Sequence, residues 1–118
     1  MTLKECYAAL NGDYEEVMGR LRSERLVQKF VLKFLEDGSF ELLCRSMEAG
    51  DLSEAFRAAH TIKGMCQNLS FTRLEKSSSA LTEALRGGKS PEAEGLFLQV
   101  REDYALTADT IREYKSGL

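Results

Sequence analysis

The chain has few β-branched residues and no long apolar run, and each shortage excludes a class of protein. Valine and isoleucine together fill only six of its 118 positions, which disfavours a β-sandwich or an α/β domain because strands prefer these residues. No run of 18 apolar residues occurs, so we expect no transmembrane span. The first 25 residues carry nine charged side chains and no apolar segment typical of a signal peptide. The simplest expectation is a cytoplasmic protein.

Cysteine and histidine are too sparse for a disulfide framework or a zinc site. The three cysteines, Cys6, Cys44 and Cys66, are odd in number, and their spacing matches no metal-binding motif. Each lies among apolar residues of a predicted helix, so we expect small buried thiols in a reducing compartment. One histidine and three scattered cysteines cannot assemble a convincing zinc site, and we expect the chain to bind no metal.

The charge balance and the composition favour one α-helical domain. A net charge of −3 disfavours a general nucleic-acid binder, which would usually be basic. An apolar content of 43% with a single proline indicates a folded core rather than a disordered chain. Leucine, alanine, glutamate, lysine and arginine fill 58 of the 118 positions, and these are strong helix formers. We therefore predict a single all-α domain spanning residues 1–118.

Apolar residues recur every three to four positions between short turn signals, which is the periodicity of amphipathic helices. Ser23 is the predicted N-cap of one helix, and Ser90 caps the last, with Pro91 at its first position. Asp51, with Glu54 three positions later, has the pattern of a capping box and is the predicted start of the fifth helix. The four longer helices should pack as an up-down four-helix bundle, with the segment 39–49 and the two short N-terminal helices covering its ends. The predicted helices span residues 2–10, 13–21, 23–37, 39–49, 51–68, 70–86 and 91 to at least 111.

One predicted helix, the fifth, turns the only histidine of the chain away from its apolar face. At 100° per residue, His60 lies well outside the apolar arc, which comprises Leu52, Ala55, Ala59, Ile62, Cys66 and Leu69. Gly64 and Gln67 lie next to His60, one and two turns further on, and Lys63 is one turn away at the border of the arc. Arg57 lies on the same side. The spacing predicts an accessible imidazole beside a cation, an amide and a residue without a side chain.

These residue types suit chemistry on a phosphoryl group. An accessible imidazole is a nucleophile near neutral pH, and Lys63 at the third position after His60 can neutralise a phosphoryl group on the ring. Gly64 costs about 1 kcal/mol relative to alanine in a helix interior, so we expect it to leave space for an incoming group. A lone histidine on a helix is more commonly structural or simply solvated, and helical angles alone do not exclude that interpretation.

The sixteen residues from Ala59 to Leu74 resemble the signature of histidine-containing phosphotransfer (HPt) domains, with the sequence AHTIKGMCQNLSFTRL. That family's core pattern is H-x-x-K-G, preceded by a small residue and followed by an apolar residue, a turn and a second helix. The resemblance covers nearly the whole chain, and Gly50-Asp51 opens the histidine helix as is common there. Met65 stands where the family often has serine or alanine, and Ser70 where it often has glycine. The resemblance therefore does not determine the shape of the chain at these two positions.

The resemblance implies a phosphoryl carrier with an HPt-like helical bundle and not an enzyme. The sequence has no nucleotide-binding motif, so we expect no autokinase activity. His60 would accept a phosphoryl group, through Nε2, from the phosphoaspartate of one receiver domain and pass it to a second. Lys63 would stabilise the phosphoryl charge, and Gly64 would leave room for the edge of the partner's active site. Gln67 would hydrogen-bond the imidazole or the phosphoryl oxygens, or it is a plain surface amide. No cofactor is expected on this chain, because the receiver's own carboxylates would hold the magnesium ion.

A local excess of positive charge favours an acidic partner. The stretch from Arg57 to Lys76 holds four cations and one carboxylate, a net charge of +3, which leaves −6 for the remaining chain. Such a patch can steer an aspartate-lined surface, although Arg73 and Lys76 are equally well interpreted as ordinary solvated residues. We expect receiver domains of response regulators or hybrid histidine kinases as partners, and neither nucleic acid nor membrane. The expected contact residues are Arg57, His60, Lys63, Gly64, Gln67 and Arg73.

Two other functions are compatible with the sequence. A non-catalytic helical adaptor would bind receiver domains or other partners through an apolar groove, and His60 would be incidental. A helper that hydrolyses receiver phosphate would need a group to orient water, for which Gln67 is the nearby candidate.

We expect a monomer, because a single core should bury the apolar faces of all the helices. The initiating Met1 and the lack of a linker at either end favour a free-standing carrier.

Overall fold

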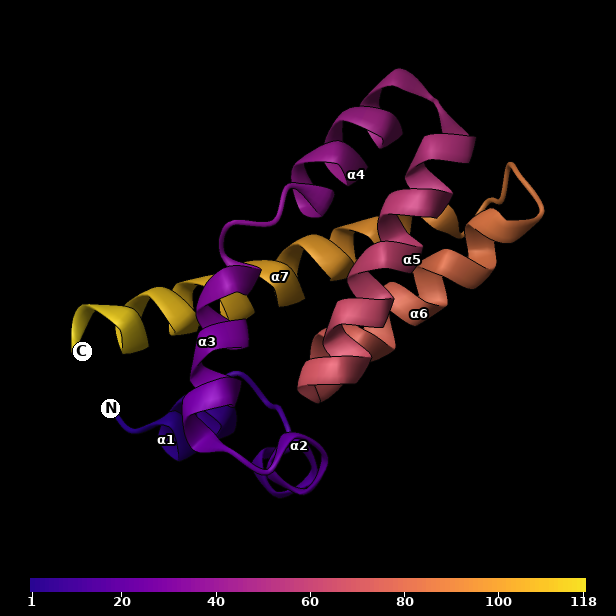
Figure 1. Ribbon diagram of the computed structural model, residues 1–118. Coiled ribbons are helices and arrows are strands. Elements are labelled where there is room, and N and C mark those ends of the chain that lie inside the picture. Colours follow the sequence, from indigo (N-terminus) through magenta and orange to yellow (C-terminus); the bar gives the residue numbers. More distant parts are fainter.

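The computed structural model describes all 118 residues and contains seven helices and no strand (Figure 1). The predicted all-α class is confirmed, and each helix begins within two residues of its predicted start. None of the helices has the length and apolarity that a membrane crossing requires. The helices are α1 (Leu3–Ala9), α2 (Tyr14–Leu21), α3 (Glu24–Phe34), α4 (Ser39–Ala49), α5 (Leu52–Leu69), α6 (Thr72–Arg86) and α7 (Ala93–Ser116).

Side-chain caps begin four of these helices. The Thr2 hydroxyl accepts the N–H of Glu5 at 3.1 Å while the N–H of Thr2 donates to the Glu5 carboxylate at 2.7 Å, which completes a capping box on α1. Asp13, Ser23 and Asp51 each accept the N–H three residues further on and so begin α2, α3 and α5. The predicted caps of α3 and α5 are confirmed.

The predicted start of the last helix is wrong by two residues. The Ser90 hydroxyl accepts the N–H of Glu92 at 3.3 Å, and the Ser90 carbonyl accepts the N–H of Ala93 at 3.3 Å. These bonds close a tight turn that contains Pro91, and α7 begins only at Ala93. Ser90 therefore caps a turn rather than the helix, because its hydroxyl bonds two residues ahead instead of three.

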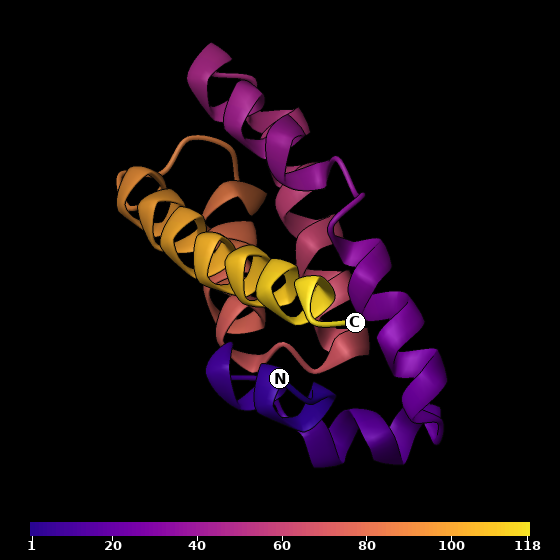
Figure 2. The same ribbon diagram turned by 90° about the vertical axis from the view of Figure 1, so that its left-hand side faces the viewer.

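Helices α4 to α7 pack as an up-down bundle in chain order, with α5 between α4 and α6 and with α6 against α7. The expectation that residues 39–49 cover an end of the bundle is wrong. Figure 2 shows α3 and α4 following one another along one side of the molecule. Phe34 of α3 and Phe40 of α4 both contact Tyr104 of α7, at ring-centroid distances of 5.7 and 3.9 Å. Two short helices in tandem thus supply one flank of the bundle, and the predicted helix over 23–37 ends at Phe34.

The N-terminal helices cover the end of the bundle where α5 turns into α6. Ser70, at this turn, has a φ of 56°, a left-handed conformation that favours glycine. Its hydroxyl donates to the Glu16 carboxylate at 2.7 Å and accepts from Arg20 at 2.9 Å, and its carbonyl accepts the N–H of Asp13 at 2.8 Å. The Tyr7 hydroxyl donates to the Leu69 carbonyl at 2.7 Å. Ser70 therefore binds α2 to the turn between α5 and α6.

Candidate functional site

The imidazole of His60 lies on the exposed face of α5, as the helical spacing predicts. The opposite face of this helix supplies six residues to the core, namely Ala55, Ala58, Ala59, Ile62, Cys66 and Leu69. Because α4 and α6 cover the two flanks of α5, only one strip of the helix is left for solvent. His60 lies on this strip in the middle of an 18-residue helix, so its backbone is held rigidly.

An aromatic ring one turn before His60 lies against the imidazole. The ring centroids of Phe56 and His60 are 6.0 Å apart and the ring planes differ by 7°. Helical side chains tilt toward the N-terminus, which is why the imidazole meets the residue four positions earlier. Phe56 is half-buried and packs on the hydrophobic core, so it connects the exposed imidazole to the interior.

Helix α6 adds an ion pair beside these rings. The guanidinium of Arg86 lies over the Phe56 ring, 5.3 Å from its centroid, and donates two hydrogen bonds of 3.1 and 2.9 Å to Glu83. The hydrogen bond and the charge of Arg86 lower the pKa of the Glu83 carboxyl, and the charges of Lys63 and His60 add smaller effects in the same direction. Glu83 therefore lies within the electrostatic field of the histidine site.

Phe56, Glu83 and Arg86 lie at the site although neither the motif nor the helical spacing predicts them as site residues. The available signal was the antiparallel pairing of the two helices about the turn at Ser70. Residues at equal distances before and after that turn lie side by side, which brings the last turns of α6 next to the segment that carries His60. A helical wheel for the histidine helix places Phe56 one turn before His60 but contains no information about Glu83 and Arg86, which belong to α6.

Lys63 and Gly64 lie where the spacing predicts them. Lys63 is half-buried and takes part in none of the five salt bridges of the chain. Gly64 is exposed, and a Cβ added to it would meet no atom within 4 Å. The packing of the chain therefore does not require glycine at this position. The same holds for the helical glycines Gly19 and Gly95, which makes them matched references for Gly64.

Gln67 and Arg57 flank the site and form no hydrogen bond with the imidazole. Gln67 is exposed, and seven residues of helix rise separate its Cα from that of His60 by about 10 Å. The imidazole leans toward Phe56, away from Gln67, and no hydrogen bond joins the two side chains. A contact of Gln67 with phosphoryl oxygens stays a prediction. Arg57 is also exposed and donates to the Glu54 carboxylate at 2.8 Å. Both residues lie on the accessible strip, as expected.

Arg73 is not brought to the histidine site. Its Nε donates to Asp103 of α7 at 2.7 Å, and it lines a groove between α6 and α7 together with Lys76. Of the four cations in the stretch from Arg57 to Lys76, two are thus paired with carboxylates outside it, through Glu54 and Asp103. The predicted patch of +3 is therefore not concentrated around His60.

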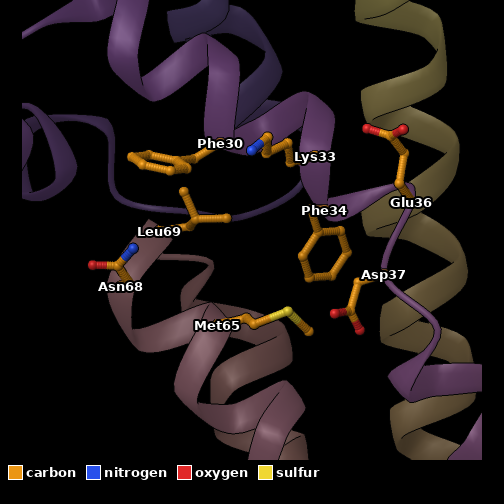
Figure 3. A pocket seen from close by; sticks show the side chains of 8 residues that line it. All are labelled: Phe30, Lys33, Phe34, Glu36, Asp37, Met65, Asn68 and Leu69. Atoms are coloured by element: carbon orange, nitrogen blue, oxygen red, sulfur yellow. The ribbon is translucent and has the colours of Figure 1, made fainter.

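Met65 lies on the side of α5 that faces α3, not beneath the imidazole. Figure 3 shows its side chain extending toward Phe34 across a groove between the two helices. The groove has a volume of about 460 Å³ and is lined by Phe30, Lys33, Phe34, Glu36, Asp37, Met65, Asn68 and Leu69. Met65 thus shapes the groove, and the imidazole of His60 stays exposed. No three histidine, cysteine or carboxylate side chains of the chain gather closely enough to hold a metal ion.

The bundle exposes the imidazole of His60 one turn from the amine of Lys63, which takes part in no salt bridge. This arrangement defines a class of domain that presents a single nucleophile on a rigid helix. The family model for the Hpt domain matches residues 15–110, and the chain belongs to this family. Membership implies phosphotransfer-type function in two-component signalling, and Hpt domains are in general phosphocarriers without catalytic activity. No curated protein and no solved structure matches the chain.

Proposed function

We propose that this protein is a histidine phosphotransfer protein of a two-component phosphorelay, in which His60 carries a phosphoryl group between aspartates of receiver domains. The observation that carries the proposal is the exposed imidazole of His60 one turn from Lys63, an amine that takes part in no salt bridge. An accessible nucleophile with a free cation nearby suits a dianionic phosphoryl group.

The transfer forms one bond and breaks one. The Nε2 lone pair of His60 attacks the phosphorus of the receiver's aspartyl phosphate, the P–O bond to the aspartate breaks, and its electron pair leaves with the carboxylate. Nδ1 retains its proton. Transfer to a second receiver reverses these changes. The magnesium ion that offsets charge in such transfers would be held by the carboxylates of the receiver.

The residues around His60 on α5 would meet the receiver. Lys63 offsets the charge of the phosphoryl group, and Gly64 lets the partner approach the helix backbone. Arg57 and Gln67 flank this contact on the accessible strip. Arg73 is left out of the proposed interface because its guanidinium is bound to Asp103.

The proposed partners are receiver domains of response regulators or hybrid histidine kinases, and the carrier would work as a cytoplasmic monomer. Only three large apolar side chains are exposed, those of Met1, Leu98 and Leu118. Stable obligate interfaces need a larger apolar centre than these residues provide.

Phosphotransfer from a labelled receiver tests the proposal. A receiver domain that carries ³²P on its aspartate should pass label to this protein, and the label should be acid-labile. His60→Gln should take up none, while Thr61→Ala, one residue further along the same helix, should take up label normally. Label on the His60→Gln variant would overturn the assignment. An adaptor would instead bind the receiver with or without the imidazole and would take up no label.

A further inference from the structure

No hydrogen bond and no salt bridge holds the ring of His60, and Phe56 is the aromatic ring that stacks on it. Neighbouring polar side chains on α5 bond elsewhere, since Arg57 donates to Glu54 and the Thr61 hydroxyl donates to the Arg57 carbonyl. No hydrogen bond of the chain reaches either ring nitrogen of His60. The last side-chain torsion of histidine has a broad energy profile, so an exposed imidazole without a contact would sample many ring orientations.

Stacking on the ring of Phe56 limits the rotation of the imidazole. A centroid distance of 6.0 Å with nearly parallel planes falls in the range of offset-stacked aromatic pairs. Phe56 is itself constrained, because its ring packs on the core and lies beneath the guanidinium of Arg86, 5.3 Å from the ring centroid. Two hydrogen bonds to Glu83 hold that guanidinium. The restraint therefore passes from α6 through Phe56 to the imidazole.

We propose that Phe56 is a positioning residue for His60, and that the Arg86–Glu83 pair of α6 holds Phe56 in place. This inference rests on the proposed phosphotransfer function. The nitrogen lone pair that attacks phosphorus lies in the plane of the imidazole, so fixing the ring plane fixes the direction of attack. Stacking uses the face of the ring and leaves both nitrogens free. A better-oriented nucleophile raises the rate of transfer within the complex and not the affinity for the receiver.

Three variants separate positioning from folding. Phe56→Leu removes the stacked ring, Phe56→Tyr keeps it, and Glu83→Ala releases Arg86 while leaving Phe56 intact. The matched control is Phe97→Leu, because Phe97 on α7 is also covered by a guanidinium, that of Arg101 at 5.8 Å. Thermal unfolding of each variant reports whether the fold is retained.

Proton NMR of the full chain gives a readout that does not depend on transfer. His60 is the only histidine, so its two ring C–H signals stand for a single residue. We expect the ring signals to move in Phe56→Leu, because the ring current of the stacked phenyl group is lost, and to stay in place in Phe56→Tyr. Glu83→Ala should move them in the same direction by a smaller amount, and Phe97→Leu should not move them.

Transfer kinetics with a phosphorylated receiver give the second readout. We expect kcat of Phe56→Leu to fall roughly five- to tenfold with KM for the receiver changed less than about twofold, and Phe56→Tyr to restore the rate. Unchanged ring signals in Phe56→Leu, a loss confined to KM, or an equal loss in Phe97→Leu would each overturn the proposal. If the wild type accepts no phosphoryl group from any receiver, the proposed function fails, and the ring signals still decide whether Phe56 orders His60.

Discussion

The Nε of Arg73 on α6 donates a hydrogen bond of 2.7 Å to Oδ1 of Asp103 on α7, and the two side chains are 41% and 3% exposed. The side-chain amide of Gln99 donates to the same oxygen at 3.1 Å. A carboxylate this buried needs such partners, because an uncompensated charge in a protein interior is costly. The pair therefore joins two helices of the bundle, and its role is structural.

Removing the guanidinium should destabilise the fold without affecting the partner. We expect Arg73→Ala to lower the free energy of unfolding by about 1–3 kcal/mol, because Asp103 loses its cationic partner while the half-exposed Arg73 is already partly screened by water. Urea denaturation checks this value. The control is Lys76→Ala, because Lys76 takes part in no salt bridge and its removal should change stability by less than about 0.5 kcal/mol. Weaker receiver binding at unchanged stability would instead place Arg73 in the interface.

Gly64 provides a test in which stability and activity change in opposite directions. Since a Cβ at this position meets nothing within 4 Å, we expect Gly64→Ala to stabilise the helix by up to about 1 kcal/mol. The added methyl group lies where the receiver would approach, so transfer should slow about tenfold. Gly19→Ala is the control, with a similar gain in stability and normal transfer. Equal transfer rates in the two variants would contradict the role proposed for Gly64.

Two substitutions of Ser70 separate the contribution of its hydrogen bonds to stability from that of its backbone strain. Both Ser70→Ala and Ser70→Gly lose the bonds to Glu16 and Arg20, at a cost of about 1–2 kcal/mol. Only glycine relieves the left-handed backbone with φ of 56°, which is worth about 1 kcal/mol. The glycine variant should therefore unfold at higher urea concentration than the alanine variant. The reverse order would show that the turn carries no strain.

Buried thiols should make the fold sensitive to alkali. Burial raises the pKa of Cys6 from 9.0 to about 11, so between these values the unfolded thiol ionises while the native one stays protonated. The unfolded state then binds fewer protons, and the free energy of unfolding falls as the pH rises from about 9 to about 11. In reducing buffer, we expect Cys6→Ala to reduce this slope by roughly 1 kcal/mol per pH unit.

The control for this titration is Cys44→Ala. Cys44 is only partly buried, so its removal should reduce the slope less than the removal of Cys6. Identical slopes for the wild type and Cys6→Ala between pH 9 and pH 11 would contradict the prediction. Comparing slopes rather than absolute stabilities removes the packing cost of each substitution.

Features that depend on one helix at a time could be predicted from the sequence. The exposure of His60 follows from the angular spacing of the apolar residues on α5, and the caps at Ser23 and Asp51 follow from side chains that bond three positions ahead. The prediction that Ser90 caps α7 is wrong because its hydroxyl accepts the N–H two positions ahead, in a turn before the helix. Local sequence does not distinguish these two bonding patterns.

Features that depend on how helices are arranged could not be predicted. Segment 39–49 has the same amphipathic pattern whether it covers an end of the bundle or lies along α5, and the contact of Phe40 with Tyr104 decides between them. The charge excess counted along the chain did not include Glu54 and Asp103, which neutralise two of its cations from outside that stretch. Phe56 is visible as a neighbour of His60 on the wheel, but Arg86 above it belongs to the next helix.

By itself, the sequence determined that the chain is helical, that one imidazole faces outward, and that a lysine and a glycine accompany it within one turn. Helical periodicity is a local property of the backbone, so these facts need no partner helix. Only the tertiary structure decided which groups surround that imidazole and which cations are free. Those contacts depend on the rotation and register of neighbouring helices, which packing of the whole core sets at once.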